Sequence, residues 1–278
     1  MPAQTLIKIE NVSKTYTTSK EDIVALQTVN LEIKEAEFVS LVGPSGCGKS
    51  TLLMLISGLY PATTGVITIK GEPVTKPYTN LGIVFQRDML LDWRNVLDNV
   101  LLQIEIRRLN RADYEPHARE LLERVGLGNF TDRYPRELSG GMRQRVSICR
   151  ALLHEPPLLL MDEPFGALDA ITRDQMNLDL ERIWEQSRKT VIFVTHSVPE
   201  AIFLSDRILV MSPRPGRIVA NIEINLPRPR TLDIRDLPEF SDYNRQIRKI
   251  FREQGILIDE LGKDKEGLGQ SPSSEVDY

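Results

Sequence analysis

The sequence predicts an α/β fold with a mostly parallel central sheet, an N-terminal antiparallel β subdomain and an inserted α-helical subdomain. Two apolar runs, LLLMD at 158–162 and TVIFVT at 190–195, are typical of parallel strands that are buried on both faces. Helical stretches at 141–153 and 170–188 lie before and between them. Because the segment from about 92 to 137 reads as helix alone, we expect a helical insert to interrupt this alternation.

Further strands are expected in the first ninety residues, where short apolar segments are separated by polar turns. These segments lie at 6–12, 29–33, 37–42, 66–71 and 81–86. The polar stretch TTSKED between the first two is typical of a loop beside a hairpin. The segment STLLMLISG after the third predicts a helix that ends at Gly58, because glycine is favoured just past a helix end.

Two helices are predicted from apolar positions spaced three and four residues apart. In the insert these positions are Ala118, Leu121, Leu122 and Val125, and near the C-terminus they are Tyr243, Ile247, Ile250 and Phe251. The segment KDKEGLGQSPSSEVDY after the second helix has too little apolar content to pack and is expected to be disordered. We therefore divide the chain into a main domain at 1–225, with its helical insert at about 88–140, and a C-terminal extension at 226–278.

The composition excludes several classes of protein. A formal net charge of −4 over 278 residues gives no support for a broad nucleic-acid-binding surface. No apolar stretch approaches the roughly 18 residues that cross a bilayer, and the N-terminus shows no secretory signal. The two cysteines, Cys47 and Cys149, predict neither a metal site nor a disulfide framework. We therefore expect a cytoplasmic protein that reaches a membrane only through a partner.

A glycine-rich turn after the strand at 37–42 matches the phosphate-binding pattern G-x-x-x-x-G-K-[ST]. The predicted nucleotide-binding residues of this P-loop are Gly43, Pro44, Ser45, Gly46, Cys47, Gly48, Lys49, Ser50 and Thr51. The glycines let backbone N–H groups surround a β-phosphate, and the following helix N-terminus adds its positive dipole. Lys49 is expected to neutralise phosphate oxygens and Ser50 to ligate Mg²⁺. The core should therefore be that of a P-loop NTPase.

Cys47 occupies a variable position of this loop. We interpret it as a tolerated small residue in preference to a redox switch. The alternative is a reactive thiol, because a helix N-terminus lowers the pKa of a nearby cysteine.

Two acidic residues lie at the end of the buried strand at 158–162. The carboxyl ends of parallel strands form the edge at which open α/β sheets bind ligands. We therefore expect Asp162 to bind Mg²⁺ or its waters, and Glu163 to polarise an attacking water.

A second candidate anion site begins the helix predicted at 141–153. Its sequence is Leu138-Ser139-Gly140-Gly141-Met142-Arg143-Gln144, which places a serine and two glycines at a helix start. With the P-loop and the acidic pair, this segment makes the chain similar to the ATP-binding subunits of ABC transporters, whose signature motif it resembles. Met142 departs from the commonest form of that motif, which has glutamine. The resemblance implies that Ser139, Gly140, Gly141 and Gln144 face the γ-phosphate held by a second copy of the chain or a paralogous ATPase subunit.

Four further residues match this family's pattern in the family's order: Tyr16, Gln86, Asp169 and His196. The resemblance implies that Tyr16 stacks on adenine and that Gln86 contacts Mg²⁺ and the attacking water. It also implies that Asp169 couples the two sites of the dimer and that His196 contacts the γ-phosphate. With ATP and Mg²⁺ as cofactors, the predicted catalytic residues are Glu163, His196 and Gln86, and the predicted Mg²⁺ ligands are Ser50, Gln86 and Asp162.

Finer resemblance points to importers. The strings PFGALDAITR, MSPRPGRI and LPRPR…PEF resemble ATPases of nitrate, taurine, aliphatic sulfonate and bicarbonate uptake, and we interpret them as lying outside the chemistry. The implied function is ATP hydrolysis that powers uptake of a small anion. The alternatives are the ATPase of an exporter or lipoprotein-release system and a soluble non-transport ABC ATPase. The implied location is peripheral, on the cytoplasmic side of the inner membrane.

The expected partners are integral-membrane permease subunits and, indirectly, an exported solute-binding protein, with no nucleic acid. The segment DMLLDW at 88–93 places apolar residues just after Gln86. Trp93 either packs within the insert, or its segment borders a groove that receives a short helix of the permease.

Overall fold

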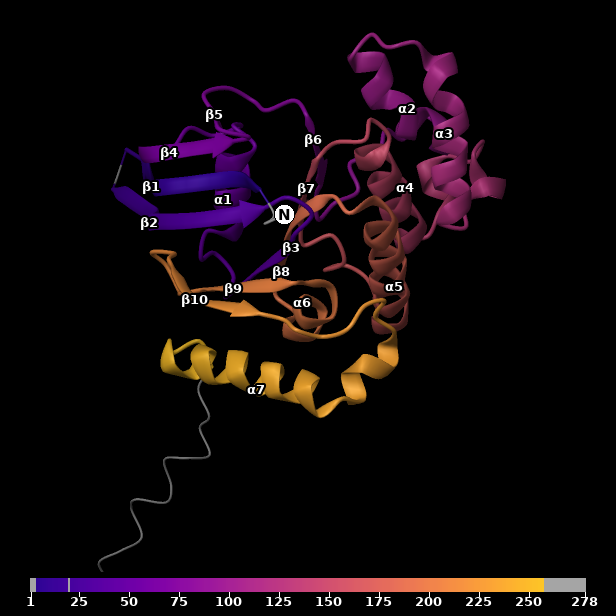
Figure 1. Cartoon of the computed structure of the whole chain (residues 1–278). Coiled ribbons are helices and arrows are strands. Elements are labelled where there is room, and N and C mark those ends of the chain that lie inside the picture. Colours follow the sequence, from indigo (N-terminus) through magenta and orange to yellow (C-terminus); the bar gives the residue numbers. More distant parts are fainter. Residues whose placement is uncertain (1–3, 20, 258–278) are drawn as a thin grey trace, which may run out of the picture.

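The computed structural model describes residues 4–19 and 21–257, which form two sheets with helices around them (Figure 1). The smaller sheet is antiparallel and contains the N-terminal strands. In spatial order its strands are β2 (Asp22–Lys34), β1 (Thr5–Thr17), β4 (Thr64–Ile69) and β5 (Glu72–Pro73). The predicted antiparallel β subdomain is therefore confirmed. The first two strands are longer than their apolar patterns indicated, because register shifts such as that between Ile9 and Val12 let the polar ends continue the pairing.

The larger sheet is the mostly parallel one that the apolar runs predicted. In spatial order its strands are β10 (Ile218–Glu223), β9 (Arg207–Met211), β3 (Phe38–Val42), β8 (Thr190–Thr195), β7 (Leu158–Asp162) and β6 (Leu81–Val84). Only the edge strand β10 runs antiparallel to its neighbour. Because β3, β7 and β8 end at the same edge, the loops that follow them lie together.

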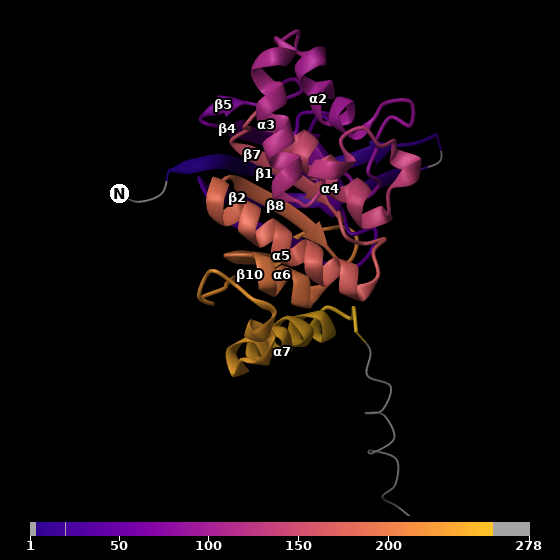
Figure 2. The same ribbon diagram turned by 90° about the vertical axis from the view of Figure 1, so that its right-hand side faces the viewer.

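The helices cover this sheet and extend beyond it (Figures 1 and 2). They are α1 (Lys49–Ile56), α2 (Val96–Ile106), α3 (Arg111–Arg124), α4 (Gly140–Leu152), α5 (Ala170–Ser187), α6 (Val198–Leu204) and α7 (Pro238–Glu253). α2 and α3 protrude at one end as a helical subdomain. The apolar positions predicted for the insert, from Ala118 to Val125, are all buried in the same cluster as Val100 and Ile104 of α2.

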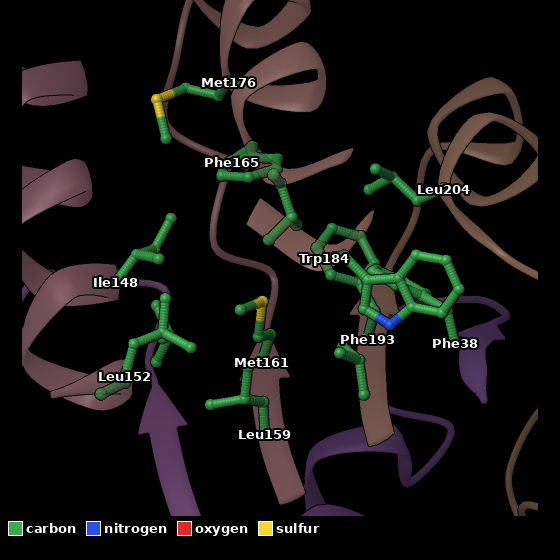
Figure 3. Packing of buried hydrophobic residues seen from close by; sticks show 14 of the residues in the cluster. Phe38, Ile148, Leu152, Leu159, Met161, Phe165, Met176, Trp184, Phe193 and Leu204 are labelled. Atoms are coloured by element: carbon green, nitrogen blue, oxygen red, sulfur yellow. The ribbon is translucent and has the colours of Figure 1, made fainter. Parts of the chain in front are cut away.

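The core lies on both faces of the larger sheet because successive side chains of a strand point to opposite faces. On β8, Phe193 belongs to the cluster beneath the helices α4, α5 and α6, whereas Ile192 belongs to the cluster with α1 and the antiparallel sheet. Aromatic rings lie among aliphatic side chains in the first cluster (Figure 3). The centroid of Phe193 lies 5.8 Å from those of both Phe38 and Phe165, and Trp184 lies 6.0 Å from Phe38. Both loops that follow β7 and β8 are thus anchored on a close-packed layer.

The C-terminal extension packs on the main domain through α7. The predicted apolar face is confirmed: Ile247 and Phe251 are buried, and Tyr243 and Ile250 are partly buried against the same core. The segment expected to be disordered lies outside the described residues. None of the helices that the structure describes is long and apolar enough to span a membrane.

Candidate functional site

The turn between β3 and α1 requires glycine at two positions. Gly46 and Gly48 have φ of 73° and 103°, which side chains rarely adopt. A Cβ on Gly48 would also lie 2.6 Å from the Leu26 side chain. The loop is therefore closed tightly enough for its backbone to surround a phosphate.

Lys49 lies inside this loop with its side chain buried. Its Nζ donates to the carbonyl oxygens of Gly43 and Pro44, each at 2.9 Å. Ser50 follows on α1, and its hydroxyl donates to Oδ1 of Asp162 at 2.9 Å. The structure thus joins the P-loop to the end of β7.

Asp162 lies in an environment that disfavours its own charge. Burial raises the pKa of Asp162, and the adjacent carboxylate of Glu163 acts in the same direction. The hydrogen bond from Ser50 and the charge of Lys49 oppose this rise in the pKa. A cation bound beside Asp162 would stabilise its ionised form.

Glu163 and His196 come from the loops after two neighbouring strands. Oε2 of Glu163 lies 3.3 Å from Nδ1 of His196, and the Glu163 N–H donates to the Val194 carbonyl at 2.9 Å. A Cβ on Gly166 would lie 3.4 Å from Nε2 of Gln86 and 3.6 Å from Oε2 of Glu163. The three side chains predicted to act on water therefore lie in one place.

A cavity of about 530 Å³ opens above these groups. Its lining residues are Tyr16, Ile23, Ala25, Ser45, Gly46, Gly48, Lys49, Ser50, Thr51, Gln86, Asp162, Glu163 and Arg214. Most of the predicted nucleotide-binding residues are thus brought together, but Gly43, Pro44 and Cys47 are not among the lining residues, and neither is the predicted catalytic residue His196. Arg214 belongs to MSPRPGRI, which sequence reasoning placed outside the chemistry.

Cys47 does not have the environment that a reactive thiol needs. The residue is fully buried, and this burial raises the pKa of its thiol above the ordinary value. The charge of Lys49, whose Nζ lies 3.8 Å from Sγ, only partly offsets the effect of burial. The alternative of a lowered pKa is therefore wrong, because desolvation of the thiol outweighs the charge of Lys49 and the hydrogen bonds to Sγ.

The segment at the start of α4 is separate from this cavity. Ser139 is the N-cap of α4, and its hydroxyl accepts from the Met142 N–H at 3.3 Å. Ser139 and Gly140 are exposed, whereas Gly141 packs against Thr172. α4 and α1 belong to clusters on opposite faces of the sheet. Ser139 and the P-loop of one chain therefore do not form a single site.

Gln144 differs from its neighbours in this segment. Its side chain is buried, and Nε2 donates to the Phe85 carbonyl at 3.4 Å. This contact joins α4 to the residue before Gln86. The burial argues against direct contact between Gln144 and a nucleotide.

Asp169 is the N-cap of α5 and is exposed to solvent. Its Oδ1 accepts from the Thr172 N–H at 3.0 Å, and this bond keeps the pKa of Asp169 below its ordinary value. Arg173 supports the preceding loop by donating to the carbonyls of Phe165 and Leu168 at 3.3 and 2.8 Å. The ionised carboxylate of Asp169 therefore lies at the surface, on a loop whose position is fixed by the hydrogen bonds of Arg173.

Comparison with known proteins decides the family. The family model described as ABC transporter matches residues 26–166. This chain belongs to the ABC transporter family. As a member of it, the chain is an ATP-binding and ATP-hydrolysing protein.

Relatives match over most of the chain. A taurine import ATP-binding protein of Rhizobium johnstonii is 48% identical over 231 residues, or 81% of this chain and 88% of that protein. A nitrate import ATP-binding protein of Synechocystis sp. is 42% identical over 252 residues, or 88% of this chain and 95% of that protein. A dimeric structure of the ATP-binding cassette MJ0796, in a post-hydrolysis state bound to ADP and phosphate, has a TM-score of 0.70 at 34% identity. That match covers 80% of this chain and 100% of the cassette.

Glu200 is a further buried group of this ABC protein, and sequence reasoning missed it. The Thr195 hydroxyl donates to Oε2 of Glu200 and accepts from the Ser197 N–H at 3.0 Å. The Ser197 hydroxyl in turn accepts from the Glu200 N–H at 3.4 Å. These bonds hold the backbone on both sides of His196. The one acid in the otherwise apolar helix VPEAIFL could have indicated this position.

An apolar groove of about 830 Å³ lies between β6 and the helical subdomain. Its lining residues are Tyr78, Thr79, Leu81, Ile83, Phe85, Met89, Leu102, Gln103, Ile106, Arg107, Leu109 and Arg150. Ile106 and Met89 expose 72% and 59% of their surface. Trp93 does not line the groove, but it exposes 75% and so does not pack within the insert.

Proposed function

We propose that this chain powers the import of a small anion, with ATP bound in the cavity above the P-loop. The observation that carries the proposal is the presence of two pairs at one cavity, Ser50 with Asp162 and Glu163 with His196. Ser50, Asp162 and Glu163 line the cavity, and His196 reaches it through its contact with Glu163. The first pair suits binding of a phosphate-bound cation. The second suits activation of water.

The residues present fit Mg²⁺. The Ser50 hydroxyl, the Asp162 carboxylate and the Gln86 amide oxygen are the hard ligands that this ion prefers. Within the described residues no group of three or more His, Cys, Asp or Glu side chains could hold a metal. Phosphate oxygens and waters would therefore complete the coordination. Bound there, Mg²⁺ would neutralise negative charge on the phosphates.

Glu163 and His196 are proposed to orient and activate the attacking water. The carboxylate accepts a hydrogen bond from the water, and the imidazole beside it donates to the γ-phosphate or to the carboxylate, according to its tautomer. Lys49 withdraws charge from the phosphates, and Tyr16 at the cavity rim provides a face for adenine. The protein thus contributes positioning and charge, which are the main requirements of phosphoryl transfer.

A complete site is proposed to need a second ATPase subunit, either another copy or a paralogue. Ser139 and Gly140 are exposed at a helix N-terminus and do not share a cavity with the P-loop. The likeness to a dimeric cassette supports closure of these residues over ATP held by the partner. Asp169 would then contact the opposite subunit.

The groove beside the helical subdomain is proposed to receive a helix of a permease subunit. Exposed apolar residues such as Ile106 suit an amphipathic helix. This contact would hold the chain at the cytoplasmic side of the inner membrane, and an exported binding protein would act through the permease. Nothing in the proposal involves nucleic acid.

The transported anion is proposed to be taurine, another sulfonate, nitrate or bicarbonate. The relatives named for taurine and nitrate import support this range. The test reconstitutes the chain with its permease and binding protein in vesicles and measures ATP-dependent uptake of each anion. Uptake of one of them is expected. Transport of a solute out of the cytoplasmic compartment would instead establish an exporter.

A further inference from the structure

The loop between β9 and β10 packs directly on the P-loop. Gly216 donates to the Ala25 carbonyl at 3.0 Å, and its carbonyl accepts from the Gln27 N–H at 2.9 Å. A Cβ on Gly216 would lie 1.9 Å from the Cys47 carbonyl oxygen, so only glycine allows this approach. The loop therefore has a fixed position relative to bound phosphate.

Arg214 projects from this loop to the rim of the nucleotide cavity. Its Nε lies 3.4 Å from the Gly46 carbonyl oxygen and donates to it. Its Nη2 lies 3.6 Å from the point that a Cβ on Gly46 would occupy. In the described part of the chain, the guanidinium makes no further hydrogen bond or ion pair, and the residue is exposed. Most of its N–H donors are therefore available to a ligand.

Without Arg214, the side chains that line the cavity carry more negative than positive charge. The carboxylates of Asp162 and Glu163 outnumber the one ammonium, Lys49, in the lining. Bound ATP brings further negative charge to the same space. Arg214 is the remaining cation of the lining, and its planar fork suits phosphate oxygens.

We propose that Arg214 is a nucleotide-binding residue whose guanidinium binds the phosphate chain of ATP from the rim of the P-loop. The inference rests on the proposed binding of ATP in this cavity. The arginine stabilises bound phosphate by its charge, and its bond to the Gly46 carbonyl directs it there. A neutral hydrogen-bond donor at position 214 would keep the bond to the Gly46 carbonyl but lose the electrostatic attraction to the phosphates.

The test measures equilibrium binding of ATP and of adenosine to the purified full-length chain by calorimetry. Arg214→Ala and Arg214→Gln are both expected to weaken ATP binding about tenfold, the scale of one hydrogen bond to a charged group. Adenosine binding should change less than twofold, because adenosine carries no phosphate. Arg217→Ala is the matched control, since Arg217 is exposed in the same loop but does not line the cavity.

Four results would overturn the inference. ATP affinity of Arg214→Ala within twofold of the wild type would show that the charge is not used. Full affinity in Arg214→Gln, or equal loss of adenosine binding, would show that the arginine only supports the loop. An equal loss in Arg217→Ala would show a general effect of surface charge. If the wild-type chain itself failed to bind ATP, that result would contradict the proposed function as well as the role of Arg214.

Discussion

The imidazole Nδ1 of His196 lies 3.3 Å from the Oε2 of Glu163, although the two residues are 33 positions apart in the chain. Each follows a buried strand of the parallel sheet, and β7 and β8 are neighbours. The two side chains meet because parallel strands deliver their C-terminal loops to one edge. Their separation is set by strands packed on the aromatic core and not by flexible loops.

Glu163→Gln is expected to lower the rate of ATP hydrolysis roughly 10²- to 10⁴-fold, which is the usual contribution of a positioned base. ATP binding should be retained, because the amide keeps the shape of the side chain and Lys49 is untouched. Since ATP would then persist between two subunits, dimer should accumulate on gel filtration with ATP. Hydrolysis by this variant at the wild-type rate would rule out Glu163 as the base.

Composite sites can be tested by mixing two inactive variants. Lys49→Ala removes the P-loop ammonium, and Ser139→Arg blocks the exposed N-terminus of α4. If each site joins the P-loop of one subunit to Ser139 of the other, a mixed dimer contains one intact site. Equal amounts should form about half mixed dimers, so ATPase activity should reappear on mixing. No recovery, with mixed dimers shown by differently tagged chains, would mean that each subunit forms its own site.

The sequence predicted the phosphate cradle and the acidic pair because both are short segments with local spacing. Arg214 and Glu200 were not predicted, because the contacts that give these residues their roles form only in the folded chain. Arg214 meets Gly46 from 168 positions away, and Glu200 is a lone acid inside a short apolar helix. The helix α6 and the strands β9 and β10, within residues 198–223, were not predicted. The α7 helix was found because four apolar positions repeat at helical spacing over a long segment.

Glu200 should make the stability of the chain depend on pH. Burial raises its pKa above the ordinary value, and this effect outweighs the Thr195 hydrogen bond and the charges of Arg173, His196 and Arg235. The unfolded chain therefore releases this proton at a lower pH than the folded chain does. Between the two pKa values the free energy of unfolding must fall as pH rises.

Glu200→Gln removes that titration while its amide oxygen still accepts from Thr195. The stability of this variant relative to the wild type should therefore increase as pH rises above the ordinary pKa of a glutamate, as measured by urea unfolding at a series of pH values. Glu155→Gln, at an exposed acid, is the matched control. The difference in free energy of unfolding between Glu200→Gln and the wild type could instead stay constant with pH. That result would show that Glu200 has the same pKa in the folded and the unfolded chain.

A charged side chain in the groove between β6 and the helical subdomain should prevent binding of the permease helix. Ile106→Arg places a guanidinium on an exposed, groove-lining position, so the fold should be unaffected, whereas docking an apolar helix would bury an unpaired charge. Co-purification with the permease subunits should fall at least tenfold, and ATP hydrolysis by the isolated chain should stay within twofold of the wild type. Val66→Arg, on an exposed apolar position of β4 away from the groove, should co-purify normally. Normal assembly of Ile106→Arg would place the permease contact elsewhere on the surface.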